Sequence, residues 1–208
     1  MSRAIHFNAP TLPASTHAIR RAFADSISAK RVFLRENAAT LACVADRVAQ
    51  CFTKGGKLLL FGNGGSAADA QHIAAEFVNR FVIERPPLPA IALTTDSSAL
   101  TSIANDYSYA DVFAKQVRAL GRAGDVAIAI STSGTSPSVV RAVDACAKLG
   151  IETVGLTGRD GGKLRGKVDH LLNVSGSKET ARIQETHILA AHVLCQLVDE
   201  KLYGRQGK

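Results

Sequence analysis

The chain has 208 residues, of which 46% are hydrophobic and 21% are charged, a balance that excludes disordered and collagen-like proteins and suits a globular one. Its 25 lysines and arginines against 18 aspartates and glutamates give a formal net charge of +7, which favours anionic partners such as phosphorylated metabolites, nucleic acid or an acidic protein face. Because there is no tryptophan and only 5% of the residues are aromatic, we do not expect a stacking platform for single-stranded nucleic acid.

The N-terminal quarter of the chain is helical in pattern. Residues 1–14 contain proline and serine but no apolar run of the kind that a secretory signal has, so we expect a loose arm and a cytoplasmic protein. From residue 16 to 53, apolar residues recur every three or four positions, which predicts helix, with a break near Asn37 that gives two helices. Their apolar positions need a partner, either the sheet of the same chain or another copy of it.

After Gly55-Gly56, short apolar runs alternate with helical stretches. Continuous apolar strands separated by helices indicate a parallel sheet that is covered on both faces. We therefore expect an α/β fold, a doubly wound five-stranded parallel sheet with an N-terminal helical extension. The predicted strands are 57–61, 90–94, 126–131, 153–156 and 170–174. The predicted helices follow the first, second, third and fifth of these strands and are 66–80, 97–104 with 110–119, 137–149 and 179–202.

The four cysteines all stand in apolar, helix-like segments, and no two of them have the C-x-x-C spacing. This pattern favours reduced, buried thiols over a disulfide framework or a thiolate metal site. The four residues are Cys43, Cys51, Cys146 and Cys195.

The first strand is followed by a glycine-rich loop, Gly62-Asn63-Gly64-Gly65-Ser66. Ligands of open parallel sheets gather at the carboxyl ends of the strands, and glycines with free helix-start amides let an anion approach the backbone. A tight turn without a ligand is the structural alternative. Gly62-x-Gly64-x-x-Ala67 also matches the dinucleotide fingerprint, but its acidic partner is expected about 20 residues further on, whereas the nearest candidate, Asp96, lies 29 residues beyond Ala67.

The third strand is followed by Ser131-Thr132-Ser133-Gly134-Thr135-Ser136, five hydroxyls in six residues, and then by Pro137. Ser136 suits a helix N-cap and Pro137 suits the first helical position. Hydroxyls and amides at a helix start form an anion site without lysine or arginine, which suits a phosphomonoester. The alternative is an ordinary serine-rich turn.

Several polar side chains lie on predicted helix faces. His72 and Glu76 are four residues apart and share a face, so they suit either a surface pair or one nitrogen and one oxygen ligand of a metal. Gln184 and His192 are about 12 Å apart along the last helix and about 80° apart in rotation, so both reach one ion only with a kink or with a neighbouring chain. Asn105-Asp106 suits either an Asx turn or hydrogen bonds to sugar hydroxyls.

Several ordered segments together resemble the sugar isomerase (SIS) superfamily and, within it, the phosphoheptose isomerase family. They are GNGGSAADAQHIAAEF, RPPLPAIALTTDSSALTSIANDYSY, STSGTSPSVV, LTGRDGGKL and ARIQETHILAAH, which span roughly residues 55–203. The resemblance implies a flavodoxin-like SIS domain over residues 55–208, with residues 1–54 forming an arm and oligomerisation helices. It also implies a homotetramer with active sites at subunit interfaces and no membrane or nucleic-acid partner.

The resemblance further implies an aldose–ketose isomerase that converts sedoheptulose 7-phosphate to D-glycero-D-manno-heptose 7-phosphate through an enediolate, for heptose and lipopolysaccharide precursors. One zinc ion per subunit is expected on His72, Glu76, Gln184 and His192, with Glu76 and His192 as the catalytic pair. The substrate-binding positions are Asn63, Gly64, Gly65, Ser66, Glu76, Asn105, Asp106, Ser131, Thr132, Ser133, Ser136 and Gln184.

A relative of the same superfamily, the DnaA initiator-associating protein, is the alternative. It is a tetramer that binds a replication initiator, and the chain shares NRF, ERP, LPAIAL, IAND, KQVRALG and RIQE-like segments with it. That relative departs from the isomerase pattern at the positions of Glu76 and His192. Because this chain keeps both residues, the enzyme is favoured.

Overall fold

The computed structural model describes residues 14–204, so the arm expected over residues 1–14 lies outside the described residues except for Ala14. None of the described helices is long and apolar enough to cross a bilayer. The strands are β1 (Leu58–Gly62), β2 (Ala90–Ala92), β3 (Val126–Ser131), β4 (Glu152–Gly158) and β5 (His170–Val174). The helices are α1 (Ala14–Thr53), α2 (Gly65–Val78), α3 (Ser97–Asp106), α4 (Val112–Leu120), α5 (Pro137–Leu149) and α6 (Thr180–Tyr203), with short 3₁₀ turns η1 (Tyr109–Asp111) and η2 (Gly162–Leu164).

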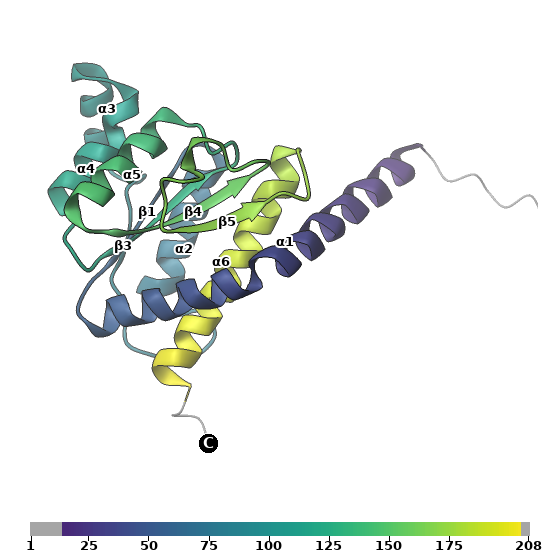
Figure 1. Ribbon diagram of the computed structural model, residues 1–208, viewed down its shortest axis with the longest axis horizontal. Coiled ribbons are helices and arrows are strands. Elements are labelled where there is room, and N and C mark those ends of the chain that lie inside the picture. Colours follow the sequence, from purple (N-terminus) through teal and green to yellow (C-terminus); the bar gives the residue numbers. More distant parts are fainter. Residues whose placement is uncertain (1–13, 205–208) are drawn as a thin grey trace, which may run out of the picture.

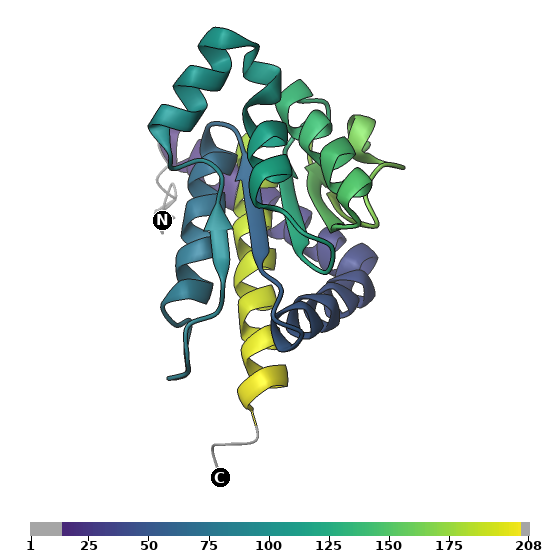
Figure 2. The ribbon, with the colours of Figure 1, turned by 90° about the vertical axis from the view of Figure 1, so that its left-hand side faces the viewer.

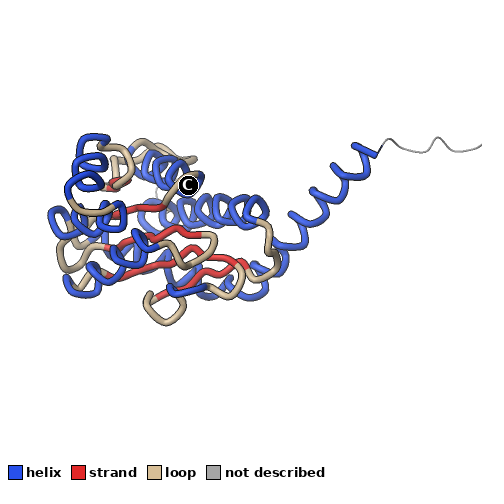
Figure 3. The backbone as a smooth tube through the Cα atoms, turned by 90° about the horizontal axis from the view of Figure 1, so that it is seen from above, coloured by secondary structure: helices blue, strands red, loops and turns tan. Residues whose placement is uncertain are grey.

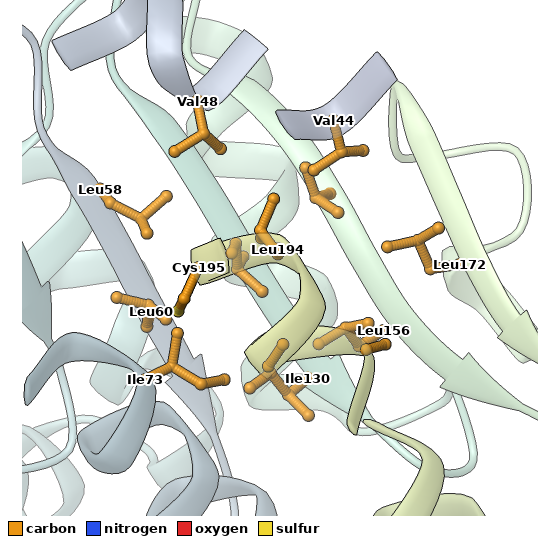
Figure 4. Packing of buried hydrophobic residues seen from close by; sticks show 14 of the residues in the cluster. Val44, Val48, Leu58, Leu60, Ile73, Ile130, Leu156, Leu172, Leu194 and Cys195 are labelled. Atoms are coloured by element: carbon orange, nitrogen blue, oxygen red, sulfur yellow. The ribbon is translucent and has the colours of Figure 1, made fainter. Parts of the chain in front are cut away.

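The five strands form one sheet in the order β2-β1-β3-β4-β5, and every neighbouring pair is parallel. Helices α1, α2 and α6 cover one face and α3, α4 and α5 cover the other (Figures 1 and 2). Alternate residues of each buried strand face the two layers, so Leu58 and Leu60 pack in one core and Leu59 and Phe61 in the other. Figure 4 shows the first core, where α1 and α6 side chains meet those of the strands. The prediction of a doubly wound parallel α/β fold is confirmed.

The predicted break near Asn37 is wrong, because α1 is one continuous helix of 40 residues. The Asn37 side chain is buried and bonds to the edge strand β5 instead of ending the helix. Its amide nitrogen donates to the carbonyls of Phe33 (3.1 Å) and Asn173 (3.2 Å), and its amide oxygen accepts from the Asn173 N–H (3.0 Å). These bonds satisfy a sheet edge that would otherwise leave buried polar groups without partners.

The two halves of α1 differ in their surroundings. The C-terminal half packs along α6 and β5 with Val44 and Val48 in the core. The N-terminal half extends away from the body of the molecule (Figures 1 and 3) and leaves Phe23 69% and Ile19 57% exposed. The helix thus packs on its own fold at one end and presents an uncovered apolar face at the other.

Three of the four cysteines are buried as predicted, and all four thiols are free in the described chain. Burial raises the pKa of Cys51 to about 11 and those of Cys146 and Cys195 to about 12, which keeps these thiols protonated at neutral pH. The prediction is wrong for Cys43, which is exposed because it lies on the outer side of α1 beside the buried position Val44.

His187 joins α6 to the sheet from inside the core. The residue is 1% exposed, and its Nε2–H donates to the carbonyl oxygen of Thr157 at 2.8 Å. Its Nδ1 atom has no partner among residues 14–204. Burial lowers the pKa of His187 from 6.5 to about 4, so the imidazole stays neutral in the native protein at neutral pH.

This buried imidazole makes stability depend on pH. Between pH 6.5 and 4 the unfolded chain binds a proton at position 187 that the native chain does not, so native stability rises with pH in this window. Acidification from pH 7 to 4 therefore removes about 3 kcal/mol through this group. We expect His187→Gln, whose amide still donates to Thr157, to lose less stability on acidification in denaturant titrations. Identical pH profiles for the two proteins contradict the assignment.

Candidate active site

The loops after β1 and β3 lie together, because these two strands are neighbours in the sheet. Asn63 joins the loops through its side chain. Its amide nitrogen donates to the hydroxyls of Ser136 (2.8 Å) and Ser138 (2.9 Å), and its amide oxygen accepts from the Tyr109 hydroxyl (2.8 Å). The two loops that the sequence singled out therefore form one polar edge, at the point where the strand order reverses.

The hydroxyl loop is fixed by contacts that require a glycine. Gly134 has a φ of 64°, a backbone conformation that residues with a side chain rarely adopt. A Cβ atom at this position would also collide with the backbone of Gly161. The Gly134 N–H donates to Ser131 (3.0 Å), and its carbonyl accepts from the Leu164 N–H (3.0 Å). The loop is held in one shape before any ligand binds.

The start of α5 adds amides to these hydroxyls. The helix begins at Pro137, and no side-chain hydrogen bond caps its N-terminus. Its first amides therefore stay available to an anion. The Ser136 hydroxyl oxygen accepts from Asn63 and lies 3.3 Å from the Ser138 hydroxyl, so the Ser136 hydrogen can be donated either to Ser138 or to an anion.

Two basic side chains that the sequence argument missed lie beside the hydroxyl loop. Arg159 and Lys178 line one hollow together with the hydroxyl residues Ser133 and Thr135, and Arg159 has the unusual φ of 59°. The sequence had indicated an anion site without lysine or arginine. Arg159 follows β4 and Lys178 follows β5, and only the folded sheet brings these segments to the loop after β3.

His72, Glu76 and His192 converge from two helices. The Nε2 atoms of His72 and His192 are 2.9 Å apart, and His72 Nε2 lies 3.3 Å from Glu76 Oε1. Ligand atoms of all three side chains lie within 4.8 Å of one another. Donors of one tetrahedral zinc, each about 2.0–2.1 Å from the ion, stand roughly 3.3–3.4 Å apart. Two imidazoles and a carboxylate that converge in this way could hold a metal ion, and they are the donor types that zinc takes.

Gln184 lies at the other end of the same pair of helices. Its amide contacts Gly65, where a Cβ atom would collide with the amide nitrogen, whereas His72 and His192 meet further along α2 and α6. The seven residues from Gly65 to His72 span about 10 Å. Within one chain, Gln184 is thus placed beside the glycine loop and about two turns from the cluster of His72, Glu76 and His192.

Within residues 14–204, the remaining predicted residues stand outside the cluster of His72, Glu76 and His192. Asn105 and Asp106 are the last residues of α3, and the Asn105 amide donates to the Asp106 carboxylate at 2.9 Å. Ser66 and Ser131 are buried. Asp96 caps α3 by accepting from the Ala99 N–H at 2.9 Å, which gives this carboxylate a structural role at the start of the helix.

Two further residues border the histidines. The Phe81 ring stacks on His192, with centroids 5.5 Å apart and an angle of 27° between the planes. Asp69 lies one turn before His72 on α2; burial raises the pKa of its carboxyl, and its Oδ2 atom has no partner within the described chain. Neither residue was predicted, nor were Tyr109 and Ser138 as partners of Asn63. The spacing of three residues between Asp69 and His72 could have indicated Asp69, whereas no spacing rule connects the distant segments of the other contacts.

Comparisons with known proteins agree on one family. The family model described as SIS domain matches residues 22–158. Phosphoheptose isomerase of Thermodesulfovibrio yellowstonii is 53% identical over 185 residues, 89% of this chain and 92% of that protein. Phosphoheptose isomerase of Roseiflexus is 58% identical over 178 residues, 86% of this chain and 90% of that protein.

Solved structures agree in both fold and sequence. The phosphoheptose isomerase of Neisseria gonorrhoeae superposes with a TM-score of 0.84 at 47% identity, and that of Francisella tularensis with 0.87 at 39%. Each comparison covers 90% of this chain and 100% of the other.

Proposed function

The chain belongs to the phosphoheptose isomerases of the SIS domain family, and from this membership we propose that it converts sedoheptulose 7-phosphate to D-glycero-D-manno-heptose 7-phosphate. One observation carries the proposal: His72, Glu76 and His192 converge from α2 and α6, and both helices begin at the edge that holds the glycine and hydroxyl loops. A phosphate anchor and a group of proton-transferring side chains thus share one side of the fold.

The reaction moves a carbonyl group from C2 to C1. A base removes a proton from C1 of the ketose, an enediolate forms, and a proton is returned to C2 while the O1 hydroxyl proton passes to O2. Glu76 is the base at carbon, and His192, which shares its cluster, moves a proton at the other side of the enediolate. Positioned acid–base groups of this kind typically contribute about 10²–10⁴-fold to the rate.

His72, Glu76 and His192 would hold a zinc ion, one for each subunit. When bound, zinc supplies a Lewis acid that polarises the carbonyl oxygen. Gln184 joins as a fourth ligand only from a neighbouring copy or after movement of α6, because its amide contacts Gly65. The ligand and base roles of Glu76 compete, since a cation beside the carboxylate lowers its basicity.

The phosphate end of the substrate is assigned to the loop Ser131–Ser136 and to the first turn of α5. Hydroxyls and amides there bind the phosphate far from the reacting carbons, and this remote binding places C1 and C2 beside Glu76. The loop of Asn63, Gly64, Gly65 and Ser66, with Asn105, Asp106 and Gln184, is assigned to the sugar hydroxyls.

The base assignment predicts the behaviour of Glu76→Gln. The amide keeps the size of the side chain but cannot take up a proton, so turnover of sedoheptulose 7-phosphate falls by about 10²-fold or more. Formation of the aldose phosphate is followed by NMR with zinc present. Glu84→Gln is the matched control, because the Glu84 side chain is 88% exposed, and it keeps full activity. Full turnover by Glu76→Gln refutes the base assignment, and no turnover by wild type refutes the proposed reaction.

The phosphate assignment predicts a different pattern for Ser136→Ala. Loss of one hydroxyl that binds the phosphate raises KM by about 5–10-fold, the equivalent of one hydrogen bond, with a smaller effect on kcat. Thr53→Ala, at the far end of α1 where the hydroxyl bonds only to Ala49 of its own helix, leaves both constants unchanged. An unchanged KM in Ser136→Ala argues against a phosphate at this loop.

The oligomer is also part of this proposal: a homotetramer with active sites at subunit interfaces. Its support is the apolar row on α1, where Phe23 and Leu34 are 69% and 66% exposed, and an apolar hollow between α1 and α6 that includes Leu41 and Leu189. Residues 1–54 then act as the arm and oligomerisation helix and residues 55–208 as the SIS domain. A cytoplasmic location and a role in heptose and lipopolysaccharide precursor synthesis complete the proposal.

The assembly is tested by placing charges on the uncovered face of α1. Phe23→Glu combined with Ile27→Glu puts carboxylates where apolar contact is expected, so the tetramer dissociates in sedimentation experiments while the circular dichroism spectrum is kept. Arg21→Glu changes an exposed charged position about 160° around the helix from Phe23, and this control stays tetrameric. A wild-type monomer at micromolar concentration contradicts the assembly.

A further inference from the structure

Arg85 is a buried cation that holds several segments together. Its side chain is fully buried and pairs with Asp199, which is also buried. The guanidinium donates to the Asp199 carboxylate from Nε at 2.7 Å. Its two terminal nitrogens donate to four backbone carbonyls, those of Glu76 (2.8 Å), Phe77 (2.8 Å), Pro86 (3.2 Å) and Asn79 (3.3 Å).

Three of these five acceptors, those of Glu76, Phe77 and Asp199, belong to the two helices of the candidate site. Glu76 and Phe77 lie in the last turn of α2, where carbonyls have no partner within the helix. Asp199 lies on α6, seven residues or about two turns after His192. One planar guanidinium therefore bonds the backbone of Glu76 to the helix that carries His192.

The same guanidinium shapes the segment between α2 and β2. The carbonyls of Asn79 and Pro86 both accept from Nη1 of Arg85, which closes this segment into a bend. Phe81 lies within the bend and stacks on His192. Arg85 thus contacts Glu76 directly, through the hydrogen bond to its backbone carbonyl. It reaches His192 indirectly, through Asp199 on the same helix and through Phe81, which stacks on the imidazole.

We propose that Arg85, held by Asp199, is a positioning residue that sets the spacing between Glu76 and His192. The inference rests on the proposed function, because it is this pair that binds the metal and moves protons. Arg85 acts through the backbone of Glu76 and through α6. Lysine cannot replace it, since a single ammonium has three donors and lacks the planar fork that reaches carbonyls on several sides.

The experiment measures zinc affinity of the full chain by competition with a chromophoric chelator, together with kcat and KM. Mutation of a residue that supports a metal ligand from the outer sphere typically weakens metal affinity by about 10–100-fold. We expect Arg85→Lys and Asp199→Ala to weaken zinc binding in this range and to lower kcat more than they raise KM. Asp199→Asn, which keeps an oxygen acceptor at the Oδ1 position, stays close to wild type in zinc affinity.

Lys57→Gln is the matched control for general destabilisation. It breaks the 2.6 Å pair of Lys57 with the buried Asp125. These two residues directly precede β1 and β3 at the amino-terminal edge of the sheet, and within the described chain the hydrogen bonds of Asp125 do not reach α2 or α6. This variant loses stability but keeps the zinc affinity and kcat of wild type.

The outcomes separate this inference from the proposed function. Wild-type zinc affinity and kcat in both Arg85→Lys and Asp199→Ala overturn the positioning role, as does an equal loss in Lys57→Gln. If Arg85→Lys does not fold, the zinc affinity and kcat of Asp199→Ala alone decide whether the positioning role holds. A wild type that turns over substrate without binding zinc refutes the metal assignment alone, and a selective loss of kcat in Asp199→Ala then supports the positioning role.

Discussion

The pairing of β1 with β3 is the constraint on which the candidate site depends. The chain places β2 on one side of β1 and β3 on the other. Helix α2 after β1 and helix α5 after β3 therefore leave on opposite faces of the sheet, and the two loops that precede them remain beside each other. The Asn63 side chain holds the two loops in one relative position through its hydrogen bonds to Ser136, Ser138 and Tyr109. The hydroxyl loop thereby gains its shape from the sheet and not from its own sequence alone.

The second element of the site is the contact between α2 and α6. Both helices run back along one face of the sheet from its carboxyl edge, with Gly65 against Gln184 at their start and His72 against His192 further along. A ligand that binds at the edge therefore meets amides and hydroxyls first and titratable side chains deeper along the helices. Arg85 and Asp199 close the far end of this pair of helices.

Two errors of the sequence argument have the same physical origin. Asn37 looked like a helix break because asparagine competes for backbone hydrogen bonds, yet its amide bonds to Asn173 of the edge strand. Cys43 looked buried because its neighbours are apolar, yet it points away from the face that carries Val44. In both cases the side of α1 on which the residue lies, toward the sheet for Asn37 and away from it for Cys43, determined the outcome.

The sequence by itself determined the strands, most helices, the parallel sheet and the positions of the glycine and hydroxyl loops, because apolar periodicity and glycine or hydroxyl clusters are local signals. The shared face of His72 and Glu76 also follows from helix spacing. Only the tertiary structure brought His192 to His72, placed Gln184 at Gly65, added Phe81 and Arg159, and bonded Arg85 across two helices. Such contacts join residues up to 120 positions apart, and they arise from the crossover of the chain and the packing of helices on the sheet, for which no local pattern exists.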